Sequence, residues 1–282
     1  MKKIVLQEMH FFLSIPAIIW QVVFLWLPLL LLVGVSFYSK IYGISLVHYW
    51  NICDISHFKV IFRSLLLASI NSFLCLAFAY PIAYFIAFRA HRAKDLLLFF
   101  LTLPFWVNFL LHVYSWFFVL ERNGILNDIL LRLHIINEPL YLANSLFAIG
   151  LVMFHSYLPF MVLPFYIIFE KLNYSLIESS ADLGATSSQT FMRITFPLTL
   201  SGARIGFFLV FILSFGEFLI PTLMGGGKLF FVGTLISNYF LLDQNLAAGA
   251  AFTTLSGAVL SGALLIAFLM FEYVYYKTTR AR

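Results

Sequence analysis

Long apolar stretches alternate with short polar ones along the whole chain. Six of these stretches have about the 20 residues that a helix needs to cross the hydrocarbon core of a bilayer. They cover residues 11–37, 65–88, 96–120, 144–170, 203–224 and 249–275. The pattern therefore predicts an all-α integral membrane protein, in which residues 1–282 form a single domain with six transmembrane helices.

The composition excludes an ordinary water-soluble fold. The chain is 62% hydrophobic and only 10% charged, with a mean hydropathy of +0.98, whereas a soluble domain carries about 25% charged residues. The first apolar run, from Phe11 to Phe37, is longer and bulkier than the apolar region of a cleaved signal peptide, which has about 7–15 residues. We expect an uncleaved first span.

The basic residues follow the predicted topology, so the net charge of +5 does not indicate nucleic-acid binding. Lysine and arginine are retained on the cytoplasmic side of a membrane. The larger share lies in the set made of both termini, residues 89–95 and residues 171–202, with Arg204 at the start of the fifth span, which predicts that both termini are cytoplasmic. Its eleven members are Lys2, Lys3, Arg89, Arg92, Lys94, Lys171, Arg193, Arg204, Lys277, Arg280 and Arg282, against Lys40, Lys59, Arg63, Arg122, Arg132 and Lys228 on the other side.

The external segment ERNGILNDILLRLHIINEPL has apolar residues at helical spacing. Ile125, Ile129, Leu130 and Leu133 recur on one side of a helix, so we expect a short amphipathic helix on the outer surface. Two interpretations stay open: a helix that rests on lipid headgroups, or a platform for an external partner.

A polar stretch, ESSADLGATSSQTFMRITFPL, interrupts the apolar pattern at residues 178–198. Ser175 and Glu178 have the spacing of a helix-starting capping box, and Gly184 permits a backbone turn or a close approach. A second helix, roughly residues 187–195, is expected to end before Pro197, because the residue ahead of proline disfavours the helical region. The prediction is two short helices that meet at an angle, with small apolar residues at the bend.

This stretch resembles the cytoplasmic signature of ABC importer permeases, Glu-Ala-Ala-x3-Gly-x9-Ile-x-Leu-Pro. Glu178, Gly184, Ile194 and Pro197 match at every interval. Ser179 and Ser180 replace the two alanines, and Phe196 replaces leucine. Three further segments, LLLFFLTLPFWVNFLLHVY, HSYLPFMVLPFYIIFEKLN and GEFLIPTLMGGG, resemble those of the spermidine/putrescine importer permeases of the B type.

The resemblance implies a type I ABC importer permease fold in a bacterial inner membrane. It implies four kinds of partner: a cytoplasmic dimer of ATPase subunits, a second permease subunit, a periplasmic polyamine-binding protein and membrane lipid. In such permeases the bend is a coupling helix held in a cleft of the ATPase. By resemblance that role falls to Glu178, Ala181, Asp182, Leu183, Gly184 and Ala185, within a cytoplasmic coupling loop at residues 171–200.

The chain itself lacks the motif of an ATPase. The segment GGGKL fails as a phosphate-binding loop, because Thr222 stands where the first glycine is required and Leu229 follows the lysine. The histidines and the two cysteines, Cys53 and Cys75, have neither metal-ligand nor disulfide spacing. We therefore expect a protein without a cofactor or a metal, which is not an enzyme and takes its energy from partner subunits.

A few polar groups within the spans are candidates for contact with cargo. An ionisable residue inside a span is costly and is a functional candidate, which singles out Glu217, near Pro221. The alternative is that Glu217 lies near the outer interface and is solvated or paired with Lys228. A carboxylate with aromatic neighbours suits a linear polycation such as a polyamine. Trp106 and Asn108, after Pro104, are further candidates for the pathway.

Two other polar residues, Asn71 and Ser72, are expected to form hydrogen bonds between helices.

Rival functions also stay open. One is an importer permease for another small solute, such as iron, an oxyanion or thiamine. The other is a channel or membrane enzyme that works alone.

Overall fold

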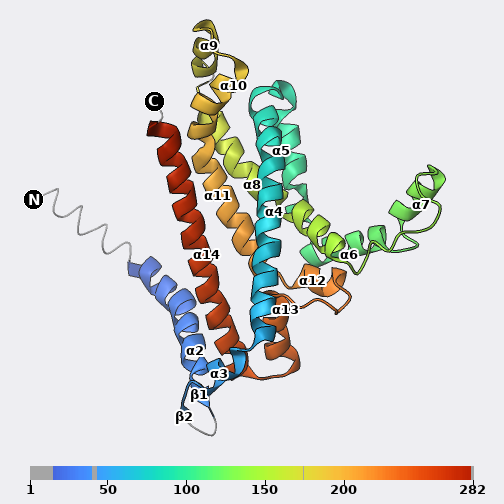
Figure 1. Ribbon diagram of the computed structural model, residues 1–282, viewed down its shortest axis with the longest axis vertical. Coiled ribbons are helices and arrows are strands. Elements are labelled where there is room, and N and C mark those ends of the chain that lie inside the picture. Colours follow the sequence, from blue (N-terminus) through green and yellow to red (C-terminus); the bar gives the residue numbers. More distant parts are fainter. Residues whose placement is uncertain (1–14, 40–42, 174, 281–282) are drawn as a thin grey trace, which may run out of the picture. The chain divides into compact units, whose positions relative to one another are not determined.

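The computed structural model describes residues 15–39, 43–173 and 175–280 (Figure 1). The chain divides into two compact units, residues 1–58 with 236–258 and residues 59–235 with 259–282. Some of the sequence-based interpretation lies outside the described residues. This applies to residues 11–14 of the predicted first span and to the basic residues Lys2, Lys3, Lys40 and Arg282.

The first unit begins with an apolar helix over Ile15–Ser36, which includes a π-helical turn, η1 (Val22–Trp26), and α2 (Leu27–Ser36). The most apolar 18-residue window of this helix is 0% buried within the structure. Soluble proteins rarely expose so large an apolar surface, so the helix suits a lipid environment. An antiparallel ribbon of β1 (Tyr38–Ser39) and β2 (Gly43–Ile44), which the sequence did not predict, leads into α3 (Val47–Ile52).

Two side-chain contacts hold the short elements of the first unit together. Ser36 Oγ lies 2.7 Å from the Tyr49 hydroxyl, which joins α2 to α3. His57 Nε2, in the first turn of α4 (Ile55–Phe88), lies 2.8 Å from the Tyr239 hydroxyl in the π-helix η5 (Asn238–Leu242). The last helix, α14 (Leu246–Arg280), begins in this unit and continues into the second.

The second unit contains the rest of α4 and the helices that follow it. Its elements in chain order are η2 (His91–Ala93), α5 (Lys94–Thr102), η3 (Leu103–Trp106), α6 (Phe109–Leu120), α7 (Ile125–Arg132), α8 (Leu146–Lys171), α9 (Ser175–Asp182), α10 (Ser187–Thr190), η4 (Phe191–Thr195), α11 (Phe196–Gly216), α12 (Leu219–Met224) and the first residues of α13 (Val232–Ser237).

The helices α8 and α11 pack against each other at the centre of the second unit (Figure 1). Gly202 and Gly206, one turn apart on α11, face α8. A Cβ atom on Gly206 would lie 2.5 Å from Met161 Sδ, and one on Gly202 would lie 3.1 Å from the carbonyl oxygen of Pro164. Small residues at this spacing let two membrane helices approach closely, so this glycine pair sets the α8–α11 contact.

A buried polar contact joins α4 to α11. The Asn71 side-chain amide donates to Ser214 Oγ over 2.8 Å, and both residues are buried. The predicted bond between helices is therefore confirmed at Asn71. At Ser72 the prediction is wrong, because its hydroxyl donates to the Ala68 carbonyl within α4. A serine hydroxyl reaches the carbonyl of the preceding turn at little cost, so it does not need a partner on another helix.

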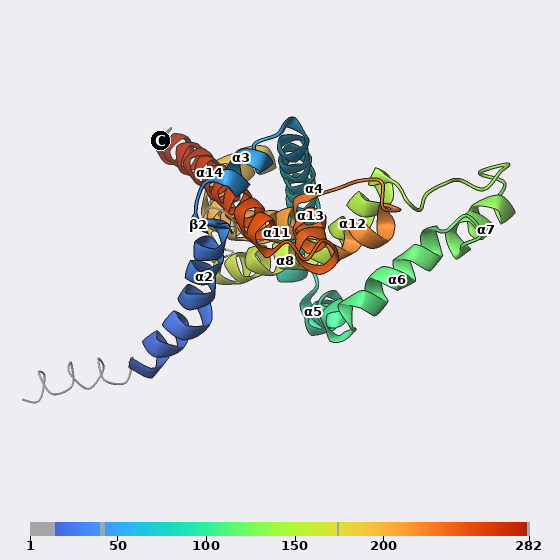
Figure 2. The same cartoon turned by 90° about the horizontal axis from the view of Figure 1, so that it is seen from below.

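Within the described residues, five helices are long and apolar enough to cross a membrane: Ile15–Ser36, Ile55–Phe88, Leu146–Lys171, Ser187–Gly216 and Leu246–Thr278. The predicted third span is instead a pair of helices, Lys94–Trp106 and Phe109–Arg132, bent by 96° (Figure 2). Pro104 lies in η3 at this bend, and proline both removes a backbone donor and crowds the preceding turn. The predicted all-α membrane fold is present, with six spans when the bent pair counts as one.

The helix that was predicted to end before Pro197 does not end there. Residues 187–216 form one continuous helix. The π-helical turn η4 precedes the proline, and in it the Phe196 N–H donates to the Phe191 carbonyl, five residues back. This wider turn accommodates a residue that lacks an N–H at the start of α11. The predicted helix end was wrong, because the rule for residues before proline does not take π-helical turns into account.

Candidate functional site

The bend between α9 and α10 is closed by a cap that ends on glycine. Gly184 has a φ of +81°, a backbone conformation that glycine adopts without strain. Its N–H donates to the Ala181 carbonyl at 2.9 Å, and the Ala185 N–H donates to the Ser180 carbonyl at 3.0 Å, which is the Schellman pattern. The predicted turn at Gly184 is confirmed. A close approach is not the reason for the glycine, because a Cβ there would meet nothing within 4 Å among the described residues.

Two buried hydroxyl groups link the helices on either side of the bend. Ser180 Oγ lies 2.8 Å from Thr190 Oγ1, and it also lies 2.8 Å from the Ile177 carbonyl oxygen. Each hydroxyl has one hydrogen, so both contacts are made when Ser180 donates to Ile177 and Thr190 donates to Ser180. The serine that departs from the alanine of the family signature therefore holds the bend closed.

A capping box lies at the second helix of the bend, where the sequence analysis did not place one. The Thr186 hydroxyl accepts from the Gln189 N–H, and the Gln189 side chain accepts from the Thr186 N–H. The letters TSSQ at 186–189 fit the motif, so the signal was available in the sequence. The first helix, α9, begins at Ser175 as expected, but the Ser175 N–H donates to Asn173 Oδ1. The described residues show no capping-box bond between Ser175 and Glu178, so that part of the prediction is wrong.

The predicted coupling residues lie on the open side of this bend. Leu183, at the tip, is 88% exposed although its backbone N–H is bonded to the Ser179 carbonyl. Ala185 is half-buried. An exposed leucine on a turn that is fixed by hydrogen bonds offers a partner an apolar contact without a cost of ordering. The exposed members are Glu178, Ala181, Asp182, Leu183 and Gly184.

The bend is joined firmly to the transmembrane helices behind it. The Phe191 ring, in η4, packs edge-on against Tyr80 of α4 with ring centroids 5.6 Å apart.

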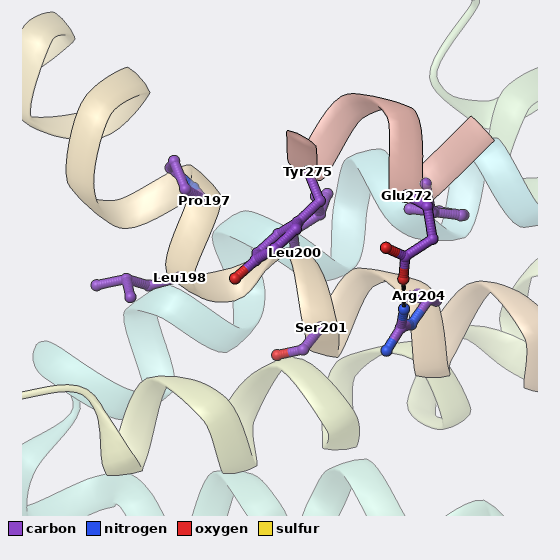
Figure 3. A pocket seen from close by; sticks show the side chains of 8 residues that line it. Pro197, Leu198, Leu200, Ser201, Arg204, Glu272 and Tyr275 are labelled. Atoms are coloured by element: carbon purple, nitrogen blue, oxygen red, sulfur yellow. Dashed lines mark hydrogen bonds and ion pairs between the residues drawn. The ribbon is translucent and has the colours of Figure 1, made fainter. Parts of the chain in front are cut away.

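A pocket of about 300 Å³ lies where the start of α11 meets the end of α14 (Figure 3). There Arg204 Nη1 lies 2.5 Å from Glu272 Oε1, as the dashed line in Figure 3 marks. Both side chains are partly exposed, so the pair links α11 to α14 at a solvated site.

Glu217 occupies a break between two helices. α11 ends at Gly216, and α12 begins at Leu219. Glu217 Oε1 accepts hydrogen bonds from the Leu219 N–H at 2.8 Å and the Ile220 N–H at 3.2 Å, while Oε2 accepts one from the Tyr157 hydroxyl of α8. Among the described residues these three donors are its partners, and Lys228 is not one of them. The predicted fifth span, 203–224, is therefore interrupted where its carboxylate caps the following helix.

A pocket of about 450 Å³ opens beside Glu217. Its wall is mainly aromatic and apolar, and it combines residues from the α5–α6 bend, α6, α8 and α11. Two buried polar atoms on residues of this wall, His112 Nε2 and Ser156 Oγ, have no hydrogen-bond partner among the described residues. The lining residues are Pro104, Phe105, Val107, Phe109, His112, Ser156, Tyr157, Phe160, Leu213 and Glu217.

The other two candidates for the cargo pathway do not line this pocket. The Trp106 side chain is 82% exposed. The Asn108 side chain caps α6 by accepting from the Leu110 and Leu111 N–H groups. Tyr157, which the sequence analysis did not single out, is in contact with Glu217. Its partner is 60 positions away, so only the fold reveals the pair.

The predicted amphipathic helix is present as α7. Ile125, Ile129 and Leu133 are all exposed. The buried side chain of Asn127 donates to the Glu121, Arg122 and Leu140 carbonyls and accepts from the Leu140 N–H. This asparagine fixes the segment on both sides of α7, so the apolar edge is held in a defined position. Both interpretations, lipid headgroups and an external partner, stay open.

Comparison with known proteins identifies the family. The model described as "Binding-protein-dependent transport system inner membrane component" matches residues 79–276. The chain belongs to this family. The permease is 36% identical over 267 residues to the spermidine/putrescine transport system permease protein PotB of Escherichia coli (strain K12), which covers 93% of this chain and 94% of that protein. The bend and Glu217 both lie inside the matched ranges.

Solved structures agree on the fold of the permease. A crystal structure of a bacterial ABC transporter that imports the acidic polysaccharide alginate matches with a TM-score of 0.77 at 17% identity, over 97% of this chain and 98% of that one. The alginate transporter in complex with an alginate pentasaccharide-bound periplasmic protein matches with a TM-score of 0.79 at 17% identity, over 97% of both chains. The predicted ABC importer permease fold is confirmed. The chain is an inner-membrane, multi-pass permease, and the side on which its termini lie stays a prediction.

Proposed function

We propose that this permease forms half of the membrane pore of a polyamine importer, with spermidine or putrescine as cargo. The observation that carries the proposal is the 36% identity over 93% of the chain to a spermidine/putrescine permease. The proposed partners are a dimer of cytoplasmic ATPase subunits, a second permease chain and a periplasmic polyamine-binding protein. The match to an alginate transporter in complex with a periplasmic protein supports a binding-protein partner.

The bend at residues 175–195 is the proposed contact with the ATPase. Its tip carries Leu183, 88% exposed, and is flanked by the acidic residues Glu178 and Asp182. A cleft on the ATPase would bury the leucine and the small residues beside it, Ala181, Gly184 and Ala185. ATP hydrolysis then takes place in the partner, and the resulting movement of the ATPase displaces the bend of the permease.

Movement of the bend passes to the membrane helices through the contacts of η4 and α11. η4 continues into α11 without a break, and α11 packs on α8 at Gly202 and Gly206. The Arg204–Glu272 pair ties α11 to α14. A displacement at the bend therefore moves α11 as a lever, and the pore alternates between two access states, which ATP and cargo bias together.

The pocket at Glu217 is the proposed place where cargo meets this chain. A carboxylate beside the aromatic side chains of Phe105, Phe109 and Phe160 suits an organic cation. Trp106 and Asn108 remain proposed residues of the pathway, because they border the bend whose Phe105 and Val107 line the pocket. Glu217 disfavours an anionic cargo. The same fold imports an acidic polysaccharide elsewhere, so the choice of cargo must come from side chains.

The test is uptake of labelled putrescine and spermidine by vesicles that contain the reconstituted importer. Leu183→Asp should prevent co-purification of the ATPase, because it places a charge on the apolar tip without disturbing a buried contact. Glu217→Gln should lower uptake while the ATPase still co-purifies, since glutamine can still cap α12. Glu138→Gln, at an exposed carboxylate, is the matched control. Failure of the wild-type importer to carry either polyamine would overturn the cargo assignment.

A further inference from the structure

The two carboxylate oxygens of Glu217 have different partners. Oε1 is held by two backbone N–H groups at the start of α12. Oε2 accepts from a single side chain, the Tyr157 hydroxyl. A ligand that takes the place of this hydroxyl gains the Oε2 acceptor without disturbing the cap. The half-buried carboxylate therefore has one fixed oxygen and one exchangeable oxygen.

The pocket beside Oε2 supplies further polar groups. Ser156 is 6% exposed, and its Oγ atom has no hydrogen-bond partner among the described residues. The same holds for His112 Nε2. Both residues line the pocket with Glu217. Buried polar atoms without partners are costly, so two such atoms on residues that line the same pocket are candidates for bonding a ligand there.

We propose that this pocket binds one terminal primary ammonium group together with the alkyl chain attached to it, and that Tyr157 holds the place of the ammonium at Glu217 when cargo is absent. A primary ammonium has three N–H donors. Glu217 Oε2, Ser156 Oγ and His112 Nε2, in the tautomer protonated on Nδ1, supply three acceptors. The methylene chain lies against Phe105, Phe109 and Phe160. The inference rests on the proposed function as far as it concerns polyamine cargo.

This arrangement predicts a preference among cations. A quaternary ammonium has no N–H, so it would leave Ser156 and His112 without partners and would meet only the charge and the rings. A primary ammonium satisfies the charge and both buried groups. Tyr157 then contributes to specificity, because every cargo must displace its hydroxyl from Glu217. Only a cargo that donates a hydrogen bond to Glu217 Oε2 in its place avoids the free-energy cost of losing that bond.

The first experiment measures putrescine uptake by the reconstituted importer. Tyr157→Phe keeps the ring and removes the competing hydroxyl, so we expect KM to fall about tenfold, the effect of one hydrogen bond to a charged group, while kcat does not rise in proportion. Ser156→Ala and His112→Phe should each raise KM. Ser115→Ala, whose hydroxyl bonds within α6, is the control. A KM for Tyr157→Phe that is unchanged or higher would overturn the proposal.

A second experiment does not depend on the cargo. The purified importer is titrated with n-butylammonium and with n-butyltrimethylammonium, and binding is followed by calorimetry. We expect tighter binding of n-butylammonium, and loss of that preference in Ser156→Ala and His112→Phe. Equal affinities in the wild type would overturn the ammonium site. If the preference is present but polyamines are not carried, the ammonium site stands and the proposed cargo falls.

Discussion

The hydroxyl of Thr190 lies 2.8 Å from the hydroxyl of Ser180, and both are buried between the two arms of the bend. Ser180 lies in the last turn of α9, and Thr190 is the last residue of α10, where that helix passes into η4. The contact therefore joins two segments that have few apolar residues with which to hold each other. It explains how a polar, glycine-centred stretch has a defined shape.

The Ser180–Thr190 pair should show the asymmetry of a buried hydrogen bond. Ser180→Ala leaves the Thr190 hydroxyl buried without a partner, which costs about 1–3 kcal/mol. The double variant Ser180→Ala/Thr190→Val removes both groups and should be less destabilised than Ser180→Ala alone. Hydrogen–deuterium exchange of residues 180–190 measures the difference. Faster exchange in the double variant than in Ser180→Ala would contradict the assigned bond.

Substitutions at Gly184 should separate shape from docking. Gly184→Ala imposes the left-handed conformation on a side chain, at a cost of about 1–2 kcal/mol, whereas asparagine tolerates it better. Gly184→Asn should therefore keep more protection from exchange at the bend than Gly184→Ala. If the tip enters a cleft, the bulkier Asn should reduce ATPase association more than Ala. The same order of the two variants in both measurements would argue against docking at this residue.

The glycines on α11 should be sensitive to size. Gly206→Leu requires the α8 backbone at Met161 to move away, because a Cβ at this position would already lie 3.3 Å from Met161 Cα. We expect a loss of about 1–3 kcal/mol, as for other overpacked cores, seen as a lower thermal midpoint in detergent. Gly150→Leu, on α8 with nothing within 4 Å of its Cβ, is the control. Equal midpoints for both variants would mean that the helices are not held at this distance.

The ion pair between Arg204 and Glu272 should contribute little to stability. Its effect should be clearest when the charge of one partner is reversed. Their side chains are 36% and 47% exposed, and exposed pairs contribute about 0–1 kcal/mol. Arg204→Glu places two acids together, so it should lower the thermal midpoint, and adding Glu272→Arg should restore it. High salt should reduce the effect of the single variant. A double variant no more stable than Arg204→Glu would rule out a direct interaction.

The sequence predicted the parts of this molecule that depend on local spacing. Six apolar runs gave the membrane helices, and Glu178, Gly184, Ile194 and Pro197 gave the bend, because these signals lie within one stretch of chain. The contact between Glu217 and Tyr157 depends on how α8 and α11 pack, so it had no local signal. The same holds for Trp106, which is 82% exposed and lies at the 96° bend between Lys94–Trp106 and Phe109–Arg132.

Pro197 illustrates a different limit. A rule about neighbouring residues predicted a helix end, but a π-helical turn a few residues earlier changed the hydrogen-bond register. Ser180 shows the reverse case. It departs from the alanine of the signature, yet its hydroxyl contributes a contact that alanine lacks. In both cases the residue type was clear, and its effect depended on a residue at an unspecified position of the motif, Phe191 for Pro197 and Thr190 for Ser180.

The wide turn at Phe191–Thr195 also fixes a direction. It contains one residue more than an ordinary α-helical turn, and each residue of an α-helix rotates the chain by about 100°. The bend is therefore rotated about the axis of α11 by roughly a quarter-turn, compared with its direction if the helix were α-helical throughout. The number of residues between Thr190 and Pro197, and not only their identity, aims the Leu183 tip.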